Sequence, residues 1–259
     1  MKIVLIGAGN LATQVALTLK EKGLEIVQIF SRTEQSAQLL AKQIGCCFTT
    51  NSALLYPDAD VYLYAVSDDI LPGVIANISI NKGLHAHTAG SIPMLIFEAA
   101  RSNYGVFYPL QTFSKNKRVD FNKIPIFIEA NSDKNLETLR QLGEILSQTV
   151  VEANSTQRQA LHLAAVFASN FTNHLYAVAD KILKKNKLDF RLMLPLLYET
   201  LDKLHTLTPA EAQTGPAVRG DRSVINKHLA ALTDFPEEKK LYEVLSAAIA
   251  NTAQTSHNK

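Results

Sequence analysis

The chain has 259 residues, of which 47% are hydrophobic and 19% charged, and its net charge is +2. This composition is typical of a folded globular protein and excludes an intrinsically disordered chain. Charges of both signs are mixed along the sequence with no basic stripe, so we expect neither nucleic acid nor an anionic membrane as a partner. The two cysteines, Cys46 and Cys47, are adjacent, which excludes a CxxC motif, and we predict no metal site. Without a signal peptide or a membrane-spanning stretch, we expect a cytoplasmic protein.

The first half alternates short apolar runs with amphipathic stretches. We predict strands at residues 2–6, 25–30, 61–66, 85–88, 105–108, 126–129 and 149–152, and helices at 11–22, 33–44 and 133–146. This alternation is typical of βαβ units and of a mostly parallel sheet. The fold class is therefore α/β, and we predict a Rossmann-type dinucleotide-binding domain over residues 1–153.

From Asn154 onward the pattern is helical throughout. Asn154 or Ser155 begins a long helix that reaches about Lys185, and two later helices are expected from about residues 221 and 236. The long helix carries no charged residue between positions 158 and 180, so we expect it to be buried on most sides. We predict an all-helical substrate and dimerisation domain over residues 154–259, through which the protein forms a homodimer.

The strongest motif follows the first strand, where Gly7-Ala8-Gly9-Asn10-Leu11-Ala12 opens a helix as a G-x-G-x-x-A sequence. Gly7 permits the tight turn, Gly9 lets a pyrophosphate approach the backbone, and Ala12 allows the helix to pack closely on the strand. The free N–H groups and the helix dipole then attract phosphates. We predict that Gly7, Ala8, Gly9, Asn10 and Leu11 bind a dinucleotide.

The end of the second strand indicates which dinucleotide binds. A site for NAD places Asp or Glu there to hold the ribose hydroxyls. This chain has Ser31-Arg32-Thr33 instead, and a guanidinium flanked by hydroxyls suits a 2′-phosphate. We predict NADP(H) as the cofactor, with its 2′-phosphate bound by Ser31, Arg32 and Thr33. The alternative is that Arg32 is an ordinary surface residue.

Two later strand ends are expected to complete the cleft, because ligands of open parallel sheets lie beyond the carboxyl ends of the strands. Val66 and Ser67 follow one strand, and His87 and Thr88 end another. We assign Val66, Ser67 and Thr88 to the cofactor and His87 to the substrate. The alternative is that these residues only form caps and turns.

The long helix carries a polar but uncharged stripe. His162, Ser169 and Asn173 are spaced by seven and four residues, which places them on one face of an α-helix, with Asn170 beside them. We predict His162 as a general acid, Asn170 as a catalytic residue that orients the substrate or the nicotinamide amide, and Ser169 as a substrate contact. A hydrogen-bonded interior histidine is the alternative for His162.

The loop at residues 214–221 is rich in glycine and holds an exposed hydroxyl and one guanidinium. Functional loops have this composition, so we predict that Thr214 and Arg219 contact the substrate. A plain connector that ends in a helix cap is the alternative.

Several short sequences in one order resemble a bacterial family of two-domain NADP oxidoreductases. These are GAGNLA, SRT, AVSDD, HTAGS, FYPLQTFS, HLAAVFASNF and TGPAVRGD. The family joins a Rossmann domain to a helical domain of unknown function, and is similar in architecture to pyrroline-5-carboxylate reductase and, more distantly, to ketopantoate reductase and the beta-hydroxyacid dehydrogenases. The resemblance implies NADP(H) at residues 7–12 and 31–33, and dimers through the helical half. The beta-hydroxyacid enzymes have a catalytic Lys four residues before an Asn of the long helix, whereas Val166 precedes Asn170 here, so that chemistry is not carried over.

We therefore predict an NADP(H)-dependent oxidoreductase that reduces a C=O or C=N bond of a small metabolite. A non-catalytic NADPH-binding regulator is the alternative from another class. An enzyme that uses a deazaflavin donor to reduce NADP shares the same first domain and also remains open.

Overall fold

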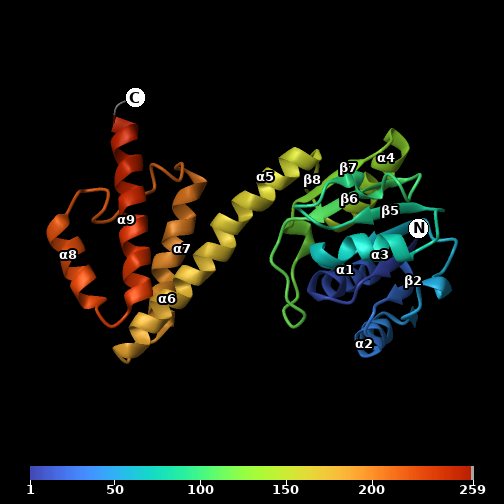
Figure 1. Cartoon of the computed structure of the whole chain (residues 1–259), viewed down its shortest axis with the longest axis horizontal. Helices are drawn as coiled ribbons and strands as arrows, with labels where there is room; N and C mark the ends of the chain where they lie inside the picture. The colour runs from blue at the N-terminus through green and yellow to red at the C-terminus, as the bar shows by residue number, and fades with distance from the viewer. Residues whose placement is uncertain (258–259) are drawn as a thin grey trace. The chain divides into compact units, whose positions relative to one another are not determined.

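A computed structural model describes residues 1–257 of the chain (Figure 1). The chain divides into two compact units, Met1–Ala168 and Ser169–Lys259. The first is called the sheet unit below, and the second the helical unit. Within the described residues, no helix is long and apolar enough to cross a membrane.

The sheet unit is built on one eight-stranded sheet in the order β3-β2-β1-β4-β5-β6-β7-β8. All neighbouring strands are parallel except β6 and β7. The strands are β1 Lys2–Ile6, β2 Glu25–Phe30, β3 Cys47–Thr49, β4 Val61–Tyr64, β5 Leu84–His87, β6 Tyr104–Pro109, β7 Ile126–Ala130 and β8 Val150–Glu152. The predicted mostly parallel Rossmann-type sheet is confirmed. Only the three-residue edge strand β3 was missed.

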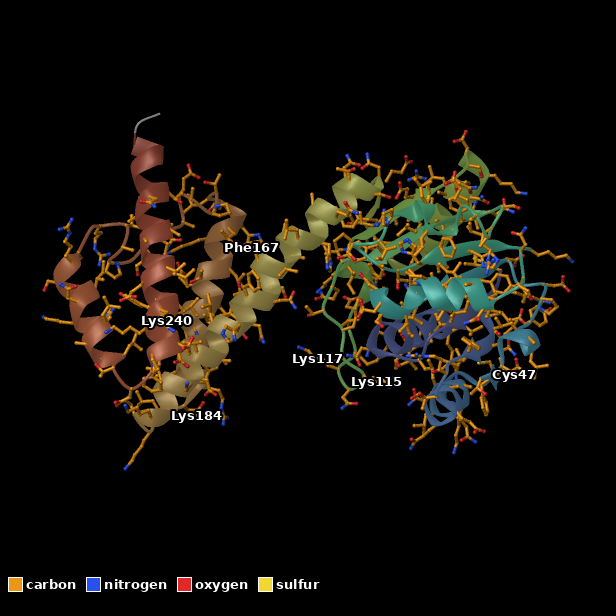
Figure 2. The ribbon with its side chains drawn as sticks, in the orientation of Figure 1. Cys47, Lys115, Lys117, Phe167, Lys184 and Lys240 are labelled. Atoms are coloured by element: carbon orange, nitrogen blue, oxygen red, sulfur yellow. The ribbon has the colours of Figure 1, made fainter. Side chains whose placement is uncertain are left out.

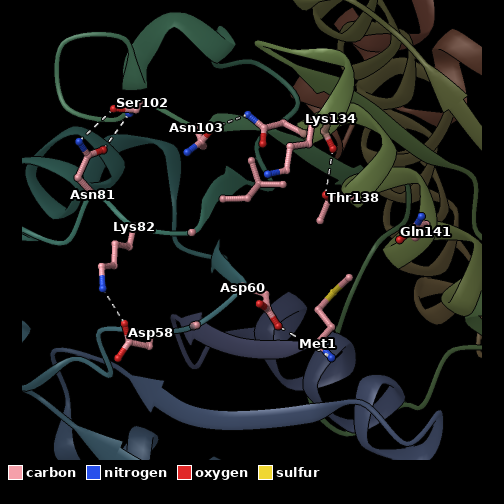
Figure 3. Close-up of a pocket in the computed structure, with 14 residues that line it drawn as sticks. Met1, Asp58, Asp60, Asn81, Lys82, Ser102, Asn103, Lys134, Thr138 and Gln141 are labelled. Carbon is pink, nitrogen blue, oxygen red and sulfur yellow. Dashed lines mark hydrogen bonds and ion pairs between the residues drawn. The ribbon is translucent and has the colours of Figure 1, made fainter.

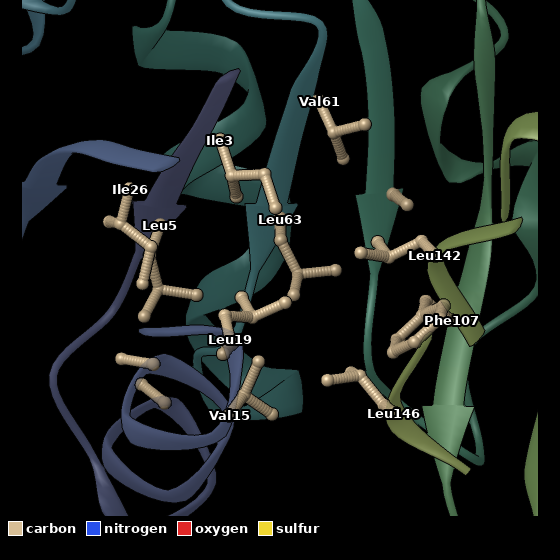
Figure 4. Packing of buried hydrophobic residues seen from close by; sticks show 14 of the residues in the cluster. Ile3, Leu5, Val15, Leu19, Ile26, Val61, Leu63, Phe107, Leu142 and Leu146 are labelled. Carbon is tan, nitrogen blue, oxygen red and sulfur yellow. The ribbon is translucent and has the colours of Figure 1, made fainter. Parts of the chain in front are cut away.

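Alternate side chains of the central strands enter different cores on the two faces of the sheet. Ile3 and Leu5 pack with the helices α1 (Asn10–Glu21), α2 (Glu34–Ile44) and α4 (Asp133–Leu146), as Figure 4 shows for part of this cluster. Val4 and Ile6 pack on the opposite face with α3 (Leu71–Asn77) and Phe97. Because both faces are covered, β1 is apolar along its length rather than alternating.

Short helical turns complete the connections. The 3₁₀ segments are η1 Ser52–Leu54, η2 Asp68–Ile70, η3 Met94–Phe97, η4 Phe121–Lys123, η6 Phe190–Met193 and η7 Lys203–His205, and η5, Val166–Phe171, is a π-helix.

Helix α5 (Ser155–Ala165) begins the helical part of the sequence, yet it belongs to the sheet unit. Asn154 and Gln157 form a capping box at its start. Arg158 is completely buried and donates to the Glu129 carboxylate of β7 at 2.5 Å. The predicted boundary at residue 153 thus marks the end of the last strand, but not the division between the compact units. The buried ion pair between α5 and the sheet explains the difference.

The helical unit contains α6 (Thr172–Lys185), α7 (Leu194–Asp202), α8 (Arg222–Ala231) and α9 (Pro236–His257). Asp221 accepts from the Val224 N–H at 3.2 Å and caps α8 as expected. The predicted burial of the long helix is wrong for the single chain, since Phe167 and Phe171 are more than half exposed. Within the described part of this unit, the buried apolar side chains are those of Ala217, Leu232 and Phe235.

Candidate functional site

The glycine-rich turn between β1 and α1 has the backbone that a dinucleotide requires. Gly7 has a φ of +126°, and a Cβ atom there would lie 2.2 Å from the carbonyl oxygen of Ala65 at the end of β4. A Cβ on Gly9 would meet no atom within 4 Å, so the backbone at Gly9 is open to a ligand. Strands β2 and β3 lie on one side of β1, and β4 and the later strands lie on the other, so the strand order reverses between β1 and β4. Dinucleotides of doubly wound folds bind at this switch point. The turn therefore fits the pyrophosphate of such a cofactor.

A cleft of about 310 Å³ lies at these strand ends and brings together three of the predicted groups. Its lining includes the glycine turn (Gly7, Ala8, Gly9), the end of β2 (Ser31, Arg32, Thr33) and the end of β4 (Ala65, Val66, Ser67). Asn10 and Leu11 do not line it with their side chains. Asn10 donates to the Phe113 carbonyl at 3.1 Å, and Leu11 packs against the core. Both residues can therefore contribute only backbone N–H groups at the helix start.

The charge of this cleft is positive. Arg32 and Lys115 are the charged residues in its lining, which contains no carboxylate, and neither side chain forms an ion pair or hydrogen bond with residues 1–257. The hydroxyls of Ser31, Thr33 and Ser36 lie in the same lining. Lys115 was not found from the sequence, because nothing in the motif indicates which residues of a distant loop return to it. Ser36, in the first turn of α2, was also missed.

Thr88 and His87 are less accessible than predicted. The Thr88 hydroxyl donates to the carbonyl of Tyr64 at 3.1 Å and does not line the cleft. His87 is completely buried, stacks on Phe97 and accepts from the Ala89 N–H at Nδ1. Burial, together with the nearby Arg158 guanidinium, lowers the pKa of His87 to about 3, while the backbone of Pro93 acts in the opposite direction. A neutral buried ring does not fit the predicted role of His87 as a substrate contact.

The predicted acid His162 has a partner that the sequence analysis missed. The hydroxyl of Tyr108, near the end of β6, lies 3.1 Å from His162 Nδ1. Both atoms face Gly90, where a Cβ would come within 2.9 Å of each, so the glycine leaves room for the pair. Burial raises the pKa of the Tyr108 phenol, as does Asp68, while Arg158 opposes them. The phenol therefore holds its proton at neutral pH. The sequence did contain a signal for this residue, because Tyr108 stands at the carboxyl end of the strand predicted at residues 105–108, where ligands of parallel sheets bind.

Arg158 fixes the position of His162, which lies one helical turn later on α5. Besides Glu129, its guanidinium donates to the carbonyls of Ile92 at 2.6 Å and Ala89 at 3.3 Å. These two carbonyls flank the segment that contains Gly90. The ion pair thus holds α5 against the same loop that Tyr108 and His162 face.

Four other predicted residues belong to the helical unit, and their roles stay predictions. Ser169 and Asn170 lie in the π-helix, whereas Thr214 and Arg219 are exposed in the loop before α8. A π-helical turn is wider than an α-helical turn and changes the register of the helix. The prediction that His162, Ser169 and Asn173 share one face assumed an uninterrupted α-helix, so it does not hold. π-helical turns are frequent at functional sites. In the described chain, no group of three or more His, Cys, Asp or Glu residues could hold a metal ion.

A larger hollow of about 790 Å³ lies at the opposite edge of the sheet, where the strands begin (Figure 3). Its charges are mostly paired within the protein: Lys82 contacts Asp58 at 3.0 Å, and the N-terminal amine lies 3.9 Å from Asp60. Ligands of open parallel sheets bind at the other edge. The smaller cleft lies at that other edge, and within residues 1–257 its two cations have no partner.

Family models match both parts of the chain. Residues 2–88 match the model described as NADP oxidoreductase coenzyme F420-dependent, and residues 124–249 match a domain of unknown function, DUF2520. Among curated proteins, glutamyl-tRNA reductase from Idiomarina loihiensis is 25% identical over 186 residues, which are 71% of this chain. The match spans 42% of the length of that relative.

Solved structures extend the similarity over the whole chain. A "putative NADP oxidoreductase" from Bacteroides fragilis is 49% identical, with 96% of this chain and 98% of that one covered and a TM-score of 0.90. An imine reductase from Myxococcus stipitatus in complex with NADP⁺ is 15% identical, with 100% and 94% covered and a TM-score of 0.67. 1-Pyrroline-5-carboxylate reductase from Streptococcus pyogenes is also 15% identical, with 100% and 99% covered and a TM-score of 0.65. The last two show a shared fold.

Three observations point to the same family. They are the backbone of the glycine turn, the positive charge of the cleft beside it, and a relative that is 49% identical along nearly the full length. The chain belongs to the family of NADP oxidoreductases that joins an N-terminal Rossmann domain to a C-terminal DUF2520 domain.

Proposed function

We propose that the protein is an NADP(H)-dependent reductase that acts on a C=O or C=N bond of a small metabolite. The observation that supports this cofactor is the cleft beside the glycine turn. No carboxylate lines this cleft, and Arg32 has no partner among residues 1–257. A carboxylate at this place would repel a 2′-phosphate, whereas a guanidinium can bind it with two hydrogen bonds. The hydroxyls of Ser31, Thr33 and Ser36 line the same cleft and add donors, although the Ser31 hydroxyl also accepts from the Thr33 N–H at 3.4 Å.

The cofactor preference can be measured by calorimetric titration with NADPH and NADH. We expect NADPH to bind more tightly and Arg32→Ala to remove most of the difference. A charge-assisted hydrogen bond contributes about 1.5–3 kcal/mol, so the loss of NADPH affinity is expected to be about 10- to 100-fold. Lys42→Ala, an exposed cation on the outer part of α2, is the matched control and should leave both affinities unchanged. Equal affinities in the wild type would overturn the proposed preference.

The reaction type is supported by the Tyr108–His162 pair and by two relatives of the same fold, named imine reductase and pyrroline-5-carboxylate reductase. When bound, the nicotinamide supplies the hydride. The protein then has to place the substrate and provide a proton to the oxygen or nitrogen of the C=O or C=N bond, while the hydride goes to its carbon. A protonated phenol next to an imidazole can do this, with either group as the immediate donor and the other as its source.

A screen of NADPH oxidation with keto acids, cyclic imines and aldehydes distinguishes a reductase from a regulator. For a reductase, His162→Ala and Tyr108→Phe should keep NADPH affinity and lower turnover about 100-fold or more, the usual contribution of a positioned acid. His174→Ala, an exposed histidine on α6, is the control and should retain turnover. A regulator predicts no turnover with any compound, and an effect of His162→Ala only on binding to a protein partner.

We also propose that two copies associate through the helical unit. Among the described residues of this unit, few apolar side chains are buried, while large ones remain exposed on several helices and in the connection after α6: Leu188, Leu192, Leu196, Tyr198, Leu201, Leu204 and Val244. So much exposed apolar surface in one region is typical of a permanent protein interface. A second copy is the partner that is always available to cover it.

A further inference from the structure

The loop between β6 and η4 is attached to the helix that follows the glycine turn. Its tip is a small hairpin, with a bridge between Ser114 and Lys117. Figure 2 shows Lys115 and Lys117 at this tip. Asn10 and Gln14 of α1 both donate to main-chain carbonyls of the loop, that of Phe113 at 3.1 Å and that of Ser114 at 2.7 Å.

Gln14 is the centre of this attachment. Its side chain is completely buried, and its Nε2 also donates to the Lys115 carbonyl at 3.3 Å. Its Oε1 accepts from Arg118 at 3.1 Å, and Arg118 pairs with Glu21 farther along α1 at 2.7 Å. A buried amide is costly unless it is hydrogen-bonded. These bonds therefore fix the loop to α1 at a defined place.

The attachment brings Lys115 to the cofactor cleft. Lys115 lines it together with Arg32 and Ser36. A neighbouring hollow of about 360 Å³ between α1 and α2 shares Ala8, Ser36 and Lys115 with the cleft. Within the described chain, the Lys115 ammonium has no hydrogen-bond or ion-pair partner, unlike the adjacent cation Arg118. The cleft therefore holds two cations and no compensating charge of its own.

We propose that Lys115 is a second ligand of the 2′-phosphate and increases the selectivity for NADP(H) over NAD(H). The inference rests on the proposed function, because it needs a 2′-phosphate in this cleft. A phosphate monoester carries a charge of about −1.5 to −2 at neutral pH, so Arg32 alone leaves part of it uncompensated. The pyrophosphate is instead expected at the N–H groups at the start of α1. Lys115 lines both hollows together with Ser36, which lies in the first turn of α2 four residues after Arg32. This shared lining puts Lys115 on the side of the 2′-phosphate.

The test compares Lys115→Ala with the wild type by calorimetric titration with four ligands. NADPH and adenosine 2′,5′-bisphosphate carry the 2′-phosphate, whereas NADH and adenosine 5′-monophosphate lack it. We expect about a tenfold loss of affinity for the first two and no change for the last two. Lys115 is exposed, so its replacement should not prevent folding. Lys117→Ala, two residues along the same hairpin and outside the cleft lining, is the matched control and should behave as the wild type.

Each result decides the inference. A wild type that prefers NADPH and a Lys115→Ala variant that binds all four ligands like the wild type would overturn the role of Lys115 alone. An equal loss for all four ligands would also overturn it, since Lys115 would then contact a part that they share. A wild type with no preference for the 2′-phosphate would overturn the proposed cofactor, and with it this inference.

Discussion

The sheet unit and the helical unit bury their apolar residues very differently. The sheet unit has two dense cores, one on each face of the sheet, and its central strands are inaccessible. The helical unit buries few apolar side chains in its described part and exposes leucines on successive turns of its helices. The first unit packs its apolar residues within the single chain, whereas the second exposes the apolar surface that we propose a second copy covers.

This difference indicates how the two halves contribute to function. The residues that line the cofactor cleft, and the Tyr108–His162 pair, all belong to the sheet unit, which the single chain already packs. The predicted substrate contacts of residues 169–219 belong to the unit that buries few apolar side chains in its described part. Cofactor binding should therefore be a property of each chain, and substrate binding should depend on assembly.

The largest effect on the free energy of unfolding is expected for the ion pair that attaches α5 to the sheet. Glu129→Leu removes the carboxylate that pairs with Arg158 and leaves a guanidinium buried without counter-charge, which costs about 3–5 kcal/mol. Urea unfolding followed by circular dichroism measures the loss. Glu152→Leu is the control, because its pair with Arg140 is largely exposed and contributes less than about 1 kcal/mol. Similar losses for both variants would mean that α5 is not part of the sheet unit in solution.

The second effect tests the exposed face of the helical unit. Sedimentation equilibrium should give the mass of two chains at micromolar concentration. Leu196→Asp places a charge on that face, and we expect the dimer to weaken at least about 100-fold, or roughly 3 kcal/mol. Leu54→Asp changes an equally exposed leucine of the sheet unit and should leave the mass unchanged. A wild-type monomer, or equal effects of both substitutions, would remove the distinction between the two surfaces.

The third effect, which is smaller per pH unit, concerns the pH dependence of the stability of the sheet unit. Burial, aided by Arg101 near His85 and Arg158 near His87, lowers both pKa values to about 3. In the unfolded chain both titrate near 6.5, so unfolding takes up protons below that pH. Their contribution to stability is complete above about pH 6.5 and is lost as the pH falls toward 3. The expected slope is up to about 1.4 kcal/mol per pH unit for each histidine.

Urea unfolding at several pH values between 7.5 and 4.5 measures this slope. His87→Phe removes one of the two titrating rings and should reduce the slope by about half, whatever its effect on stability at pH 7.5. A free energy of unfolding that does not change with pH over this range would show that the rings are hydrated or charged in the folded protein.

The fold could be predicted because its signals are local. The apolar run of Ile3–Ile6 followed by the glycine turn, and the caps at Asn154 and Asp221, each depend on residues that are neighbours in the sequence. The ends of β1, β2 and β4 met as expected, because parallel strands carry their carboxyl ends to one edge.

The residues that were missed depend on long-range packing. Lys115 reaches the cleft only because Gln14, a hundred positions earlier, is buried against its loop. Tyr108 meets His162 because Arg158 holds α5 on β7. The exposure of Phe171 could not be predicted, because the spacing of apolar residues identifies the apolar face of a helix but does not show which residues pack against that face.

The most direct test of the account is a crystal structure of the protein with NADP⁺. We predict the pyrophosphate at the backbone N–H groups between Gly7 and Leu11, and 2′-phosphate oxygens within hydrogen-bond distance of Arg32, about 2.7–3.2 Å. The nicotinamide should extend along the carboxyl ends of β4 and β5 toward Tyr108. A 2′-phosphate that points into solvent away from Arg32, or a dinucleotide bound in the hollow at the opposite edge of the sheet, would contradict the account.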